Sequence, residues 1–237
     1  MFTPGSNTTL GASGPKKAGR SAHEESSAEA AADASEERAR RIVEAAYRLL
    51  EEGGLDGLTI RAVLKETGLA RRAFYERFAG KDDLMVAVFK YSILGATRRY
   101  EQMFGSTPDP MERLKLIITT ISMGEAMLVT DSPQAINRRG AALSREHLRL
   151  SEFRPEDLQA ALQPLISLIA EQLALGMEQG KVRKEYSPQR LAVLVYNLVS
   201  TTAHKEFLSA DLSENARERR AQLAADIWEF CRRAIAA

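Results

Sequence analysis

The chain has 237 residues, of which 44% are hydrophobic and 27% charged, a balance that predicts a soluble globular protein with a buried core. Lys and Arg number 33 against 32 Asp and Glu, and the resulting net charge of +1 argues against a uniformly basic nucleic-acid-binding protein. The single cysteine excludes an intramolecular disulfide and a four-cysteine zinc site, and it favours a reducing cytoplasm. No apolar run reaches the roughly 18 residues of a membrane span, and no apolar leader opens the chain, so no membrane partner is expected.

Residues 1–35 differ in composition from the rest of the chain. Ala, Ser and Gly make up more than half of them, and only Met1, Phe2 and Leu10 are large apolar residues. Such a segment buries too little apolar surface to offset the entropy lost on ordering, which predicts a flexible tail. Three basic residues leave open a contact between this tail and a phosphate backbone, although a solvated tail is the simpler interpretation: Lys16, Lys17 and Arg20.

Helical periodicity covers the remainder of the chain. Apolar residues recur at spacings of three and four from Glu36 onward, and we find no series of alternating, strand-like runs. The sequence therefore predicts an all-α fold, with a small three-helix domain over 36–83 and a larger helical domain over 84–237. In the small domain, Gly53-Gly54 should end the first helix, Thr59 should cap a second that ends at Gly68, and a third should cover about 71–78.

The larger domain is predicted to contain long helices. They are expected over 81–104, 111–129, 134–150, 156–179, 188–209 and 214–235. Proline and glycine mark their ends, with Pro133, Pro155 and Pro188 at starts and Gly180 at an end. Pro164 falls inside one pattern and should kink or restart that helix.

The segment from Thr59 to Lys81 has the pattern of a helix-turn-helix, whose second helix enters the DNA major groove. Phe74 and Phe78, four residues apart, would anchor that second helix to the domain core. Basic residues outnumber acidic ones by four over this segment, and local charge governs the attraction to phosphate more than total charge does. The near-zero net charge therefore localises a DNA-binding surface rather than excluding one.

The side chains beside these anchors suit base and phosphate recognition. Arginine can bond guanine through two hydrogen bonds, glutamate can accept one from cytosine, and a tyrosine or threonine hydroxyl can hold a phosphate. An arginine pair on a short helix is, taken alone, more often a solvated face. The combination of turn, cap, anchors and Lys81 favours DNA binding.

Residues 36–85 resemble the DNA-binding domain of the TetR family of transcriptional regulators. The likeness is carried by the first helix, ERARRIVEAAYRLLEEGGLDGLT, and by Gly68-Leu69, Phe74-Tyr75, Phe78 and Gly80-Lys81-Asp82-Asp83-Leu84. The resemblance implies that Thr59 and Tyr75 bind phosphates, and that Lys81 binds one beside the N-terminal amides of its helix. It also implies that a further group faces base edges or the flanking backbone: Arg61, Arg71, Arg72, Ala73, Glu76 and Arg77.

The chain departs from the family pattern at three positions. Ala70 stands where a capping serine is usual, and Leu64 and Arg72 replace small residues. The missing cap costs on the order of 1 kcal/mol of helix stability. These departures bear on the crossing of the two helices and on the operator sequence, not on DNA binding itself.

A homodimer is expected because one helix-turn-helix rarely binds DNA tightly enough alone. Apolar stripes on the last two helices suggest the interface, and the resemblance implies that these helices pair with their copies in a four-helix bundle. Packing within the chain competes for the same residues. The predicted interface residues are Leu191, Leu194, Val195, Leu198, Ala221, Ala225 and Trp228.

The middle helices would hold a pocket for a small effector if the resemblance extends that far. Aromatic and methionine side chains suit an adaptable apolar cavity, although each is more often plain core. The candidates are Tyr100, Phe104, Met123, Met127 and Tyr196. No catalytic motif, cofactor motif or metal-ligand set is found, and His147 and His204 are the two histidines of the predicted folded region.

We therefore expect a homodimeric, cytoplasmic, ligand-responsive transcriptional regulator, acting as a repressor on a palindromic operator. An effector would move the helix over 81–104 and change the separation of the two recognition helices. Two alternatives remain: a helix-turn-helix protein without a small effector, and an α-helical lipid carrier or enzyme on the same fold.

Overall fold

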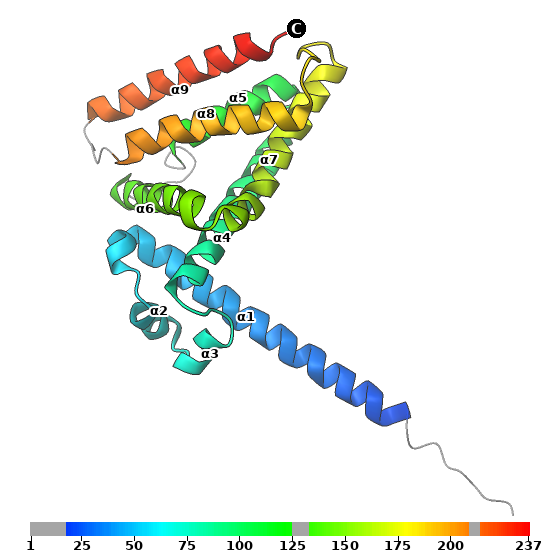
Figure 1. The fold of residues 1–237 in the computed structure, drawn as a ribbon, viewed down its shortest axis with the longest axis vertical. Coiled ribbons are helices and arrows are strands. Elements are labelled where there is room, and N and C mark those ends of the chain that lie inside the picture. The colour runs from blue at the N-terminus through cyan, green and yellow to red at the C-terminus, as the bar shows by residue number, and fades with distance from the viewer. Residues whose placement is uncertain (1–17, 125–132, 209–213) are drawn as a thin grey trace, which may run out of the picture. The chain divides into compact units, whose positions relative to one another are not determined.

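The structure is a computed structural model that describes residues 18–124, 133–208 and 214–237. Every regular element in these described residues is a helix, which confirms the all-α prediction. An isolated antiparallel bridge joins Val182 to Ala236. The chain divides into two compact units, Met1–Arg40 and Arg41–Ala237, whose boundary falls within the first helix. In chain order (Figure 1) the helices are α1 Ala18–Gly57, α2 Ile60–Thr67, α3 Arg71–Tyr75, α4 Lys81–Phe104, α5 Pro110–Met123, α6 Pro133–Phe153, α7 Pro155–Glu178, α8 Pro188–Leu208 and α9 Glu214–Ile235.

The first unit contains the N-terminal part of α1. This helix begins at Ala18, so residues 18–35 are helical where the sequence analysis predicted a flexible tail. The residues concerned are rich in alanine and glutamate, which have high helix propensity, and Glu37 binds Arg40 at 2.7 Å one turn later. Lys16 and Lys17 lie outside the described residues, and nothing in the structure bears on a contact between Arg20 and DNA.

The helix-turn-helix has the predicted ends. The Thr59 hydroxyl accepts a hydrogen bond from the Ala62 N–H at 3.1 Å and caps α2. Gly68 ends α2 in the left-handed region at φ 68°, which costs glycine no steric strain. The regular part of α1 is interrupted where predicted, because Gly54 has a non-helical φ of 61°, and a short helical stretch follows it to Gly57. One boundary differs from the prediction: α3 ends in a turn after Tyr75.

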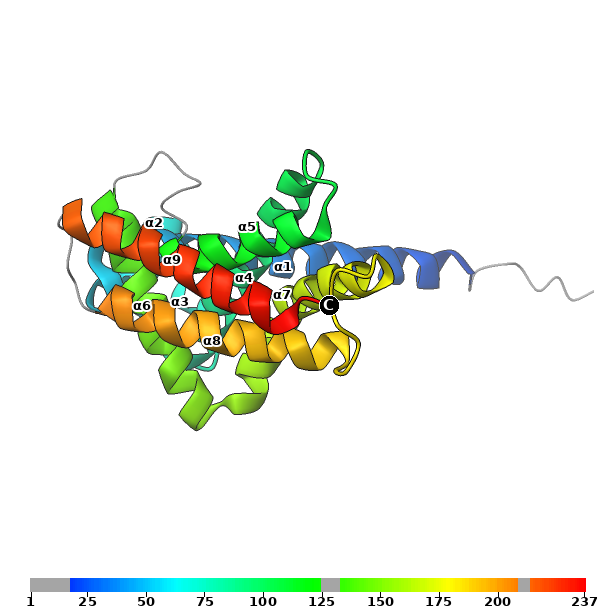
Figure 2. The same ribbon diagram turned by 90° about the horizontal axis from the view of Figure 1, so that it is seen from above.

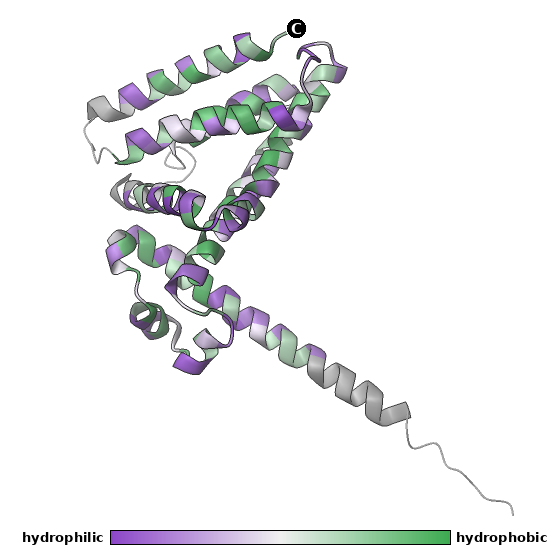
Figure 3. Cartoon of the chain, viewed as in Figure 1, coloured by the Kyte–Doolittle hydropathy of each residue, from purple (hydrophilic) through white to green (hydrophobic). Residues whose placement is uncertain are grey.

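The larger domain is built around α7, which packs against α4, α5, α6 and α8. Figure 3 shows α7 as a largely hydrophobic helix, and its inward residues include Leu165, Ile169 and Leu173. Among the described helices, α7 alone is long and apolar enough to cross a membrane, but more than half of its most apolar stretch is buried among its neighbours. Its apolar composition therefore fits the core helix of a helical domain.

The predicted helix boundaries of the larger domain are mostly correct. Pro110, Pro133, Pro155 and Pro188 each begin a helix, and α7 continues through Pro164. α9 packs on α5 and lies next to α8 (Figure 2). Within the second unit, α2 and α3 lie at the opposite end from α8 and α9 (Figure 1).

Candidate nucleic-acid interface and effector cavity

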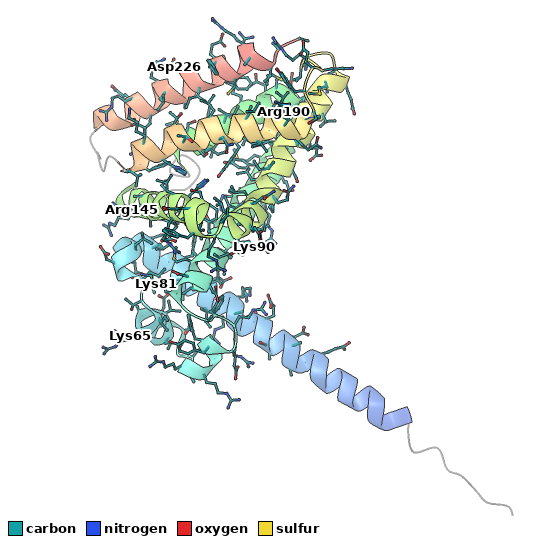
Figure 4. All side chains as sticks on the ribbon, viewed as in Figure 1. Lys65, Lys81, Lys90, Arg145, Arg190 and Asp226 are labelled. Carbon is teal, nitrogen blue, oxygen red and sulfur yellow. The ribbon has the colours of Figure 1, made fainter. Side chains whose placement is uncertain are left out.

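An exposed basic surface covers the helix-turn-helix and the start of α4. Figure 4 labels two of its residues, Lys65 on α2 and Lys81 on α4. The two acidic residues in the segment are paired: Glu66 binds Arg48 at 2.7 Å and Glu76 binds Arg72 at 2.9 Å. All six basic residues of 59–81 are exposed: Arg61, Lys65, Arg71, Arg72, Arg77 and Lys81.

The two arginines that open α3 have different partners. The Arg72 side chain is 90% exposed, and its ion pair with Glu76 links one turn of the helix. Arg71 stacks over the Tyr75 ring at 5.4 Å and donates a hydrogen bond to the Tyr75 hydroxyl at 3.4 Å. Because Phe74 is fully buried, the direction of these outward side chains is fixed. α3 therefore presents donors and one acceptor to solvent, as reading of the major groove requires.

Other residues predicted to bind DNA have roles within the chain. The Thr59 hydroxyl serves as the cap of α2, and Lys81 Nζ donates a hydrogen bond to the Leu55 carbonyl at 3.1 Å. Ala73 is half-buried, whereas the other eight predicted contacts are exposed. Ala70 provides no side-chain cap for α3, because its methyl group cannot accept a hydrogen bond from the backbone.

Polar contacts hold this domain to its neighbours. The Arg41 guanidinium donates to the Thr67 carbonyl at 2.8 Å and so completes the C-terminal end of α2. At the start of α4, Asp83 accepts hydrogen bonds from Arg154 at 2.7 Å and from the Ala79 N–H at 3.0 Å. These two bonds, the arginine first, lower the pKa of Asp83. Because Arg154 precedes α7, this ion pair joins the DNA-binding domain to the core of the larger domain.

A cavity of about 160 Å³ lies among α4, α5, α6, α7 and α8. Its walls are mainly apolar, with hydroxyl groups from a few side chains and one guanidinium. Phe207 packs against two glycines: a Cβ at Gly140 would lie 3.2 Å from the ring, and one at Gly124 would lie 2.6 Å from it. The lining residues are Ser92, Ile93, Ala96, Tyr100, Thr120, Ile121, Gly124, Arg139, Gly140, Leu143, Leu165, Tyr196 and Phe207.

Two of the five residues predicted to bind an effector line this cavity, Tyr100 and Tyr196. Phe104 is not among the lining residues; it is buried, with the Arg113 guanidinium 4.9 Å from its ring. Met123 is half-buried and is not a lining residue either, and Met127 lies outside the described residues. The walls come mostly from aliphatic side chains, whose sequence pattern does not differ from that of ordinary core.

A pair of half-buried histidines lies beside the cavity. His147 and His204 have ring centroids 4.5 Å apart, and His147 Nδ1 is 3.4 Å from the Tyr196 hydroxyl. Burial, together with the neighbouring His204, lowers the pKa of His147 to about 4, and burial also lowers that of His204. Burial raises the pKa of Tyr196. The described residues contain no group of three or more His, Cys, Asp or Glu side chains able to hold a metal ion.

The basic surface and its helix-turn-helix match a known family. The sequence profile described as "Bacterial regulatory proteins, tetR family" matches residues 42–88, which include α2, α3 and the start of α4. The DNA-binding domain belongs to the tetR family. The predicted resemblance of this domain to the TetR family is thereby confirmed.

Proteins that match most of the chain are distant relatives. The "Fatty acid metabolism regulator protein" of Bacillus subtilis is 22% identical over 162 residues, covering 68% of this chain and 79% of that protein. The crystal structure of FadR from B. subtilis in complex with stearoyl-CoA has a TM-score of 0.62 at 16% identity, covering 81% of this chain and 96% of that one. A TetR-family regulator from Pectobacterium atrosepticum has a TM-score of 0.64 at 20% identity, covering 84% and 94%. At these identities the structural likeness shows the shared fold.

The last two helices carry exposed apolar side chains. Of the residues predicted for a dimer interface, Leu191, Val195 and Trp228 are buried inside the chain and so are not available to a partner. Leu194 is 55% exposed, and the other exposed members of the predicted set are Leu198, Ala221 and Ala225. Val193 on α8, which was not among the predicted residues, and Phe230, one of the apolar positions of the last helix, are also exposed. We call Leu194, Leu198, Ala221 and Ala225, which lie one turn apart in pairs on α8 and α9, the α8–α9 face.

Proposed function

We propose that the protein is a cytoplasmic repressor that binds a palindromic operator as a homodimer and leaves it when an apolar effector enters the cavity. The observation that supports this most directly is that a basic helix-turn-helix and an apolar cavity share helix α4. Lys81 opens α4 at the DNA-binding surface, and Tyr100 near its other end lines the cavity. A change in the cavity can therefore reach the DNA-binding domain through one rigid helix.

The α8–α9 face supports the homodimer. Two leucines one turn apart on α8 are exposed, and two alanines one turn apart on α9 permit a close approach of helices. A two-fold dimer would pair this face with its own copy and place two copies of α3 on one side of the duplex. Half-sites about 34–36 Å apart would then be read together.

The effector class is suggested by the relatives and by the cavity walls. The FadR structure contains stearoyl-CoA, and the walls of the cavity here are built largely from Ile, Leu, Ala and aromatic side chains. A cavity of about 160 Å³ is smaller than the roughly 300–1,000 Å³ of typical ligand sites. We infer that an acyl chain would enter by displacing Phe207, whose ring packs against Gly124 and Gly140.

The test is selection of an operator from random DNA, followed by band-shift titrations of the full chain. Arg72→Ala should weaken operator binding by about 1–3 kcal/mol and relax the preference at one base pair, because a bidentate contact to a base is lost. The matched control is Lys184→Ala, which removes an exposed charge from the turn before α8. Decanoyl-CoA should release the operator.

Selection of no palindromic sequence, or equal effects of the two substitutions on operator affinity, would overturn the DNA-reading part of the proposal. If the operator is bound but acyl compounds never release it, the protein is a helix-turn-helix DNA-binding protein that does not respond to this effector. A catalytic turnover of decanoyl-CoA without operator binding would instead support an enzyme on the same fold.

A further inference from the structure

One lining residue of the cavity is unlike the others. Arg139, on α6, is the charged residue among the described residues that line the cavity, and the rest of the wall is apolar or carries hydroxyl groups. Arg139 is only 6% exposed, so its guanidinium is held away from bulk water. A buried guanidinium beside an apolar cavity is costly unless an anion or an aromatic ring compensates it.

The compensating groups belong to the DNA-binding domain. Arg139 forms an ion pair with Glu51, near the C-terminal end of α1, and its guanidinium lies 4.7 Å from the centroid of the Tyr47 ring. Glu51 and Tyr47 are not lining residues of the cavity. The next residue, Arg138, is exposed and donates a hydrogen bond to the Glu52 carbonyl. A single guanidinium thus contacts both the cavity and the domain that holds the recognition helix.

We propose that the effector is an apolar molecule ending in an anionic group, and that this group replaces Glu51 as the ion-pair partner of Arg139. The proposal rests on the proposed function and names the residue that reads the effector. Guanidinium binds carboxylate or phosphate oxygens through two parallel hydrogen bonds, and the described residues that line the cavity include no acidic side chain that would repel an anion. A neutral molecule of the same shape would leave the pair with Glu51 in place.

The exchange gives the effector different affinities for two states of the protein. In one state Arg139 ties α6 to α1, and in the other it binds the effector while Glu51 turns to solvent, from which its side chain is already 26% exposed. Two further ion pairs between the domains, among the described residues, join side chains that do not line the cavity: Arg149 binds Asp82 at 3.3 Å and Arg154 binds Asp83 at 2.7 Å. The anion therefore loosens one end of the DNA-binding domain while its connection to α4 is kept. A ligand shifts an equilibrium only through such a difference in affinity.

The experiment compares decanoate, decanoyl-CoA and 1-decanol as ligands of the full chain by calorimetric titration. The variants are Arg139→Gln, Arg139→Lys and Glu51→Gln, with Arg145→Gln as the matched control. Arg145 lies on the same helix but is exposed and does not line the cavity (Figure 4). Circular dichroism establishes that each variant is folded.

Wild-type protein should bind at least one of the two anions about tenfold or more tightly than 1-decanol, and Arg139→Gln should abolish that preference. Decanoate binding points to a carboxylate head, and binding of decanoyl-CoA alone points to phosphate. Glu51→Gln removes the competing anion and should tighten binding of the anionic ligand about 5- to 150-fold, the range of affinity changes that coupling between two sites typically produces. Arg145→Gln should change nothing.

Equal affinity for 1-decanol and both anions, or anion affinity unchanged in Glu51→Gln, would overturn the proposal. Glu51 is half-buried, so this variant tests the exchange even if the Arg139 variants fail to fold. The titrations need no DNA, so they stand if no operator is found. Conversely, an operator released equally by 1-decanol would refute the anion requirement while leaving the repressor assignment intact.

Discussion

Burial shifts the pKa of single side chains in this protein, and the histidine pair beside the cavity is an example. His147 lies against His204, Tyr196 and the ring of Phe89, whose centroid is 5.8 Å from its own. Charging either imidazole in this environment would cost desolvation, and charging both would add repulsion. Both rings are therefore neutral at pH 7, where they serve as packing groups with one polar contact to Tyr196.

This pair predicts acid-sensitive stability. The pKa of His147 is about 4 in the folded protein and about 6.5 when unfolded, so between these values the unfolded chain binds more protons. The free energy of unfolding should then fall as the pH is lowered from about 6.5 to about 4, by at most about 1.4 kcal/mol per pH unit for this group.

Urea denaturation at pH 7, 6 and 5 measures that slope. His147→Gln should reduce it, and Arg145→Gln, which replaces an exposed side chain of the same helix, should not. Identical slopes for wild type and His147→Gln would contradict the assignment.

At the scale of helices, packing decides where glycine is required. Gly176 is buried in α7, and a Cβ there would lie 2.6 Å from Val182 Cγ2. Val182 is itself fixed, because it is 1% exposed and forms the bridge to Ala236 at the C-terminus. Gly95 in α4 is different, since a Cβ there would lie 3.5 Å from the flexible end of Arg99.

The two glycines should respond to alanine in opposite directions. Gly176→Ala should lower the free energy of unfolding by about 1–3 kcal/mol through overpacking, less a gain of up to about 1 kcal/mol in helix propensity. Gly95→Ala should raise it by about 0.5–1 kcal/mol. Thermal unfolding of both variants gives the comparison, and equal stabilisation by both would show that Val182 moves aside freely.

Helix positions were predictable because apolar spacing and proline or glycine at the ends are local signals. The cavity was not, since Tyr100 on α4 and Tyr196 on α8 come together only because both helices pack against α5, α6 and α7. Arg139 was missed because an arginine in a polar stretch is usually solvated. The available signal was the run of small residues that follows it, Gly140, Ala141 and Ala142, because short side chains let neighbouring helices approach closely.

For the whole molecule, charge and apolar surface lie at different ends of the second unit. The basic residues of 59–81 surround α2 and α3, and the α8–α9 face lies at the opposite end (Figure 1). The sequence could predict apolar stripes on α8 and α9, but not which side of each stripe the core would take. Leu191 and Val195 are buried in the core, whereas Leu194 and Leu198 on the same helix are exposed.

Disrupting the α8–α9 face should separate the two copies. Leu194→Glu places a charge in the proposed interface and should shift the mass measured by light scattering toward that of one chain, with loss of operator affinity. Leu148→Glu is the control, because Leu148 is 49% exposed on α6, outside this face. A Leu194→Glu protein that stays dimeric would place the interface elsewhere.

The single cysteine of the chain makes motion in this protein directly measurable. Cys231 is buried, and burial raises the pKa of its thiol to about 11, so almost none of it is thiolate at neutral pH. A cysteine introduced for exposed Lys65 on α2 would thus be the one readily labelled by a nitroxide reagent, without first removing the native thiol. Electron–electron dipolar spectroscopy on the labelled dimer would then report the distance between the two copies of α2, with and without decanoate.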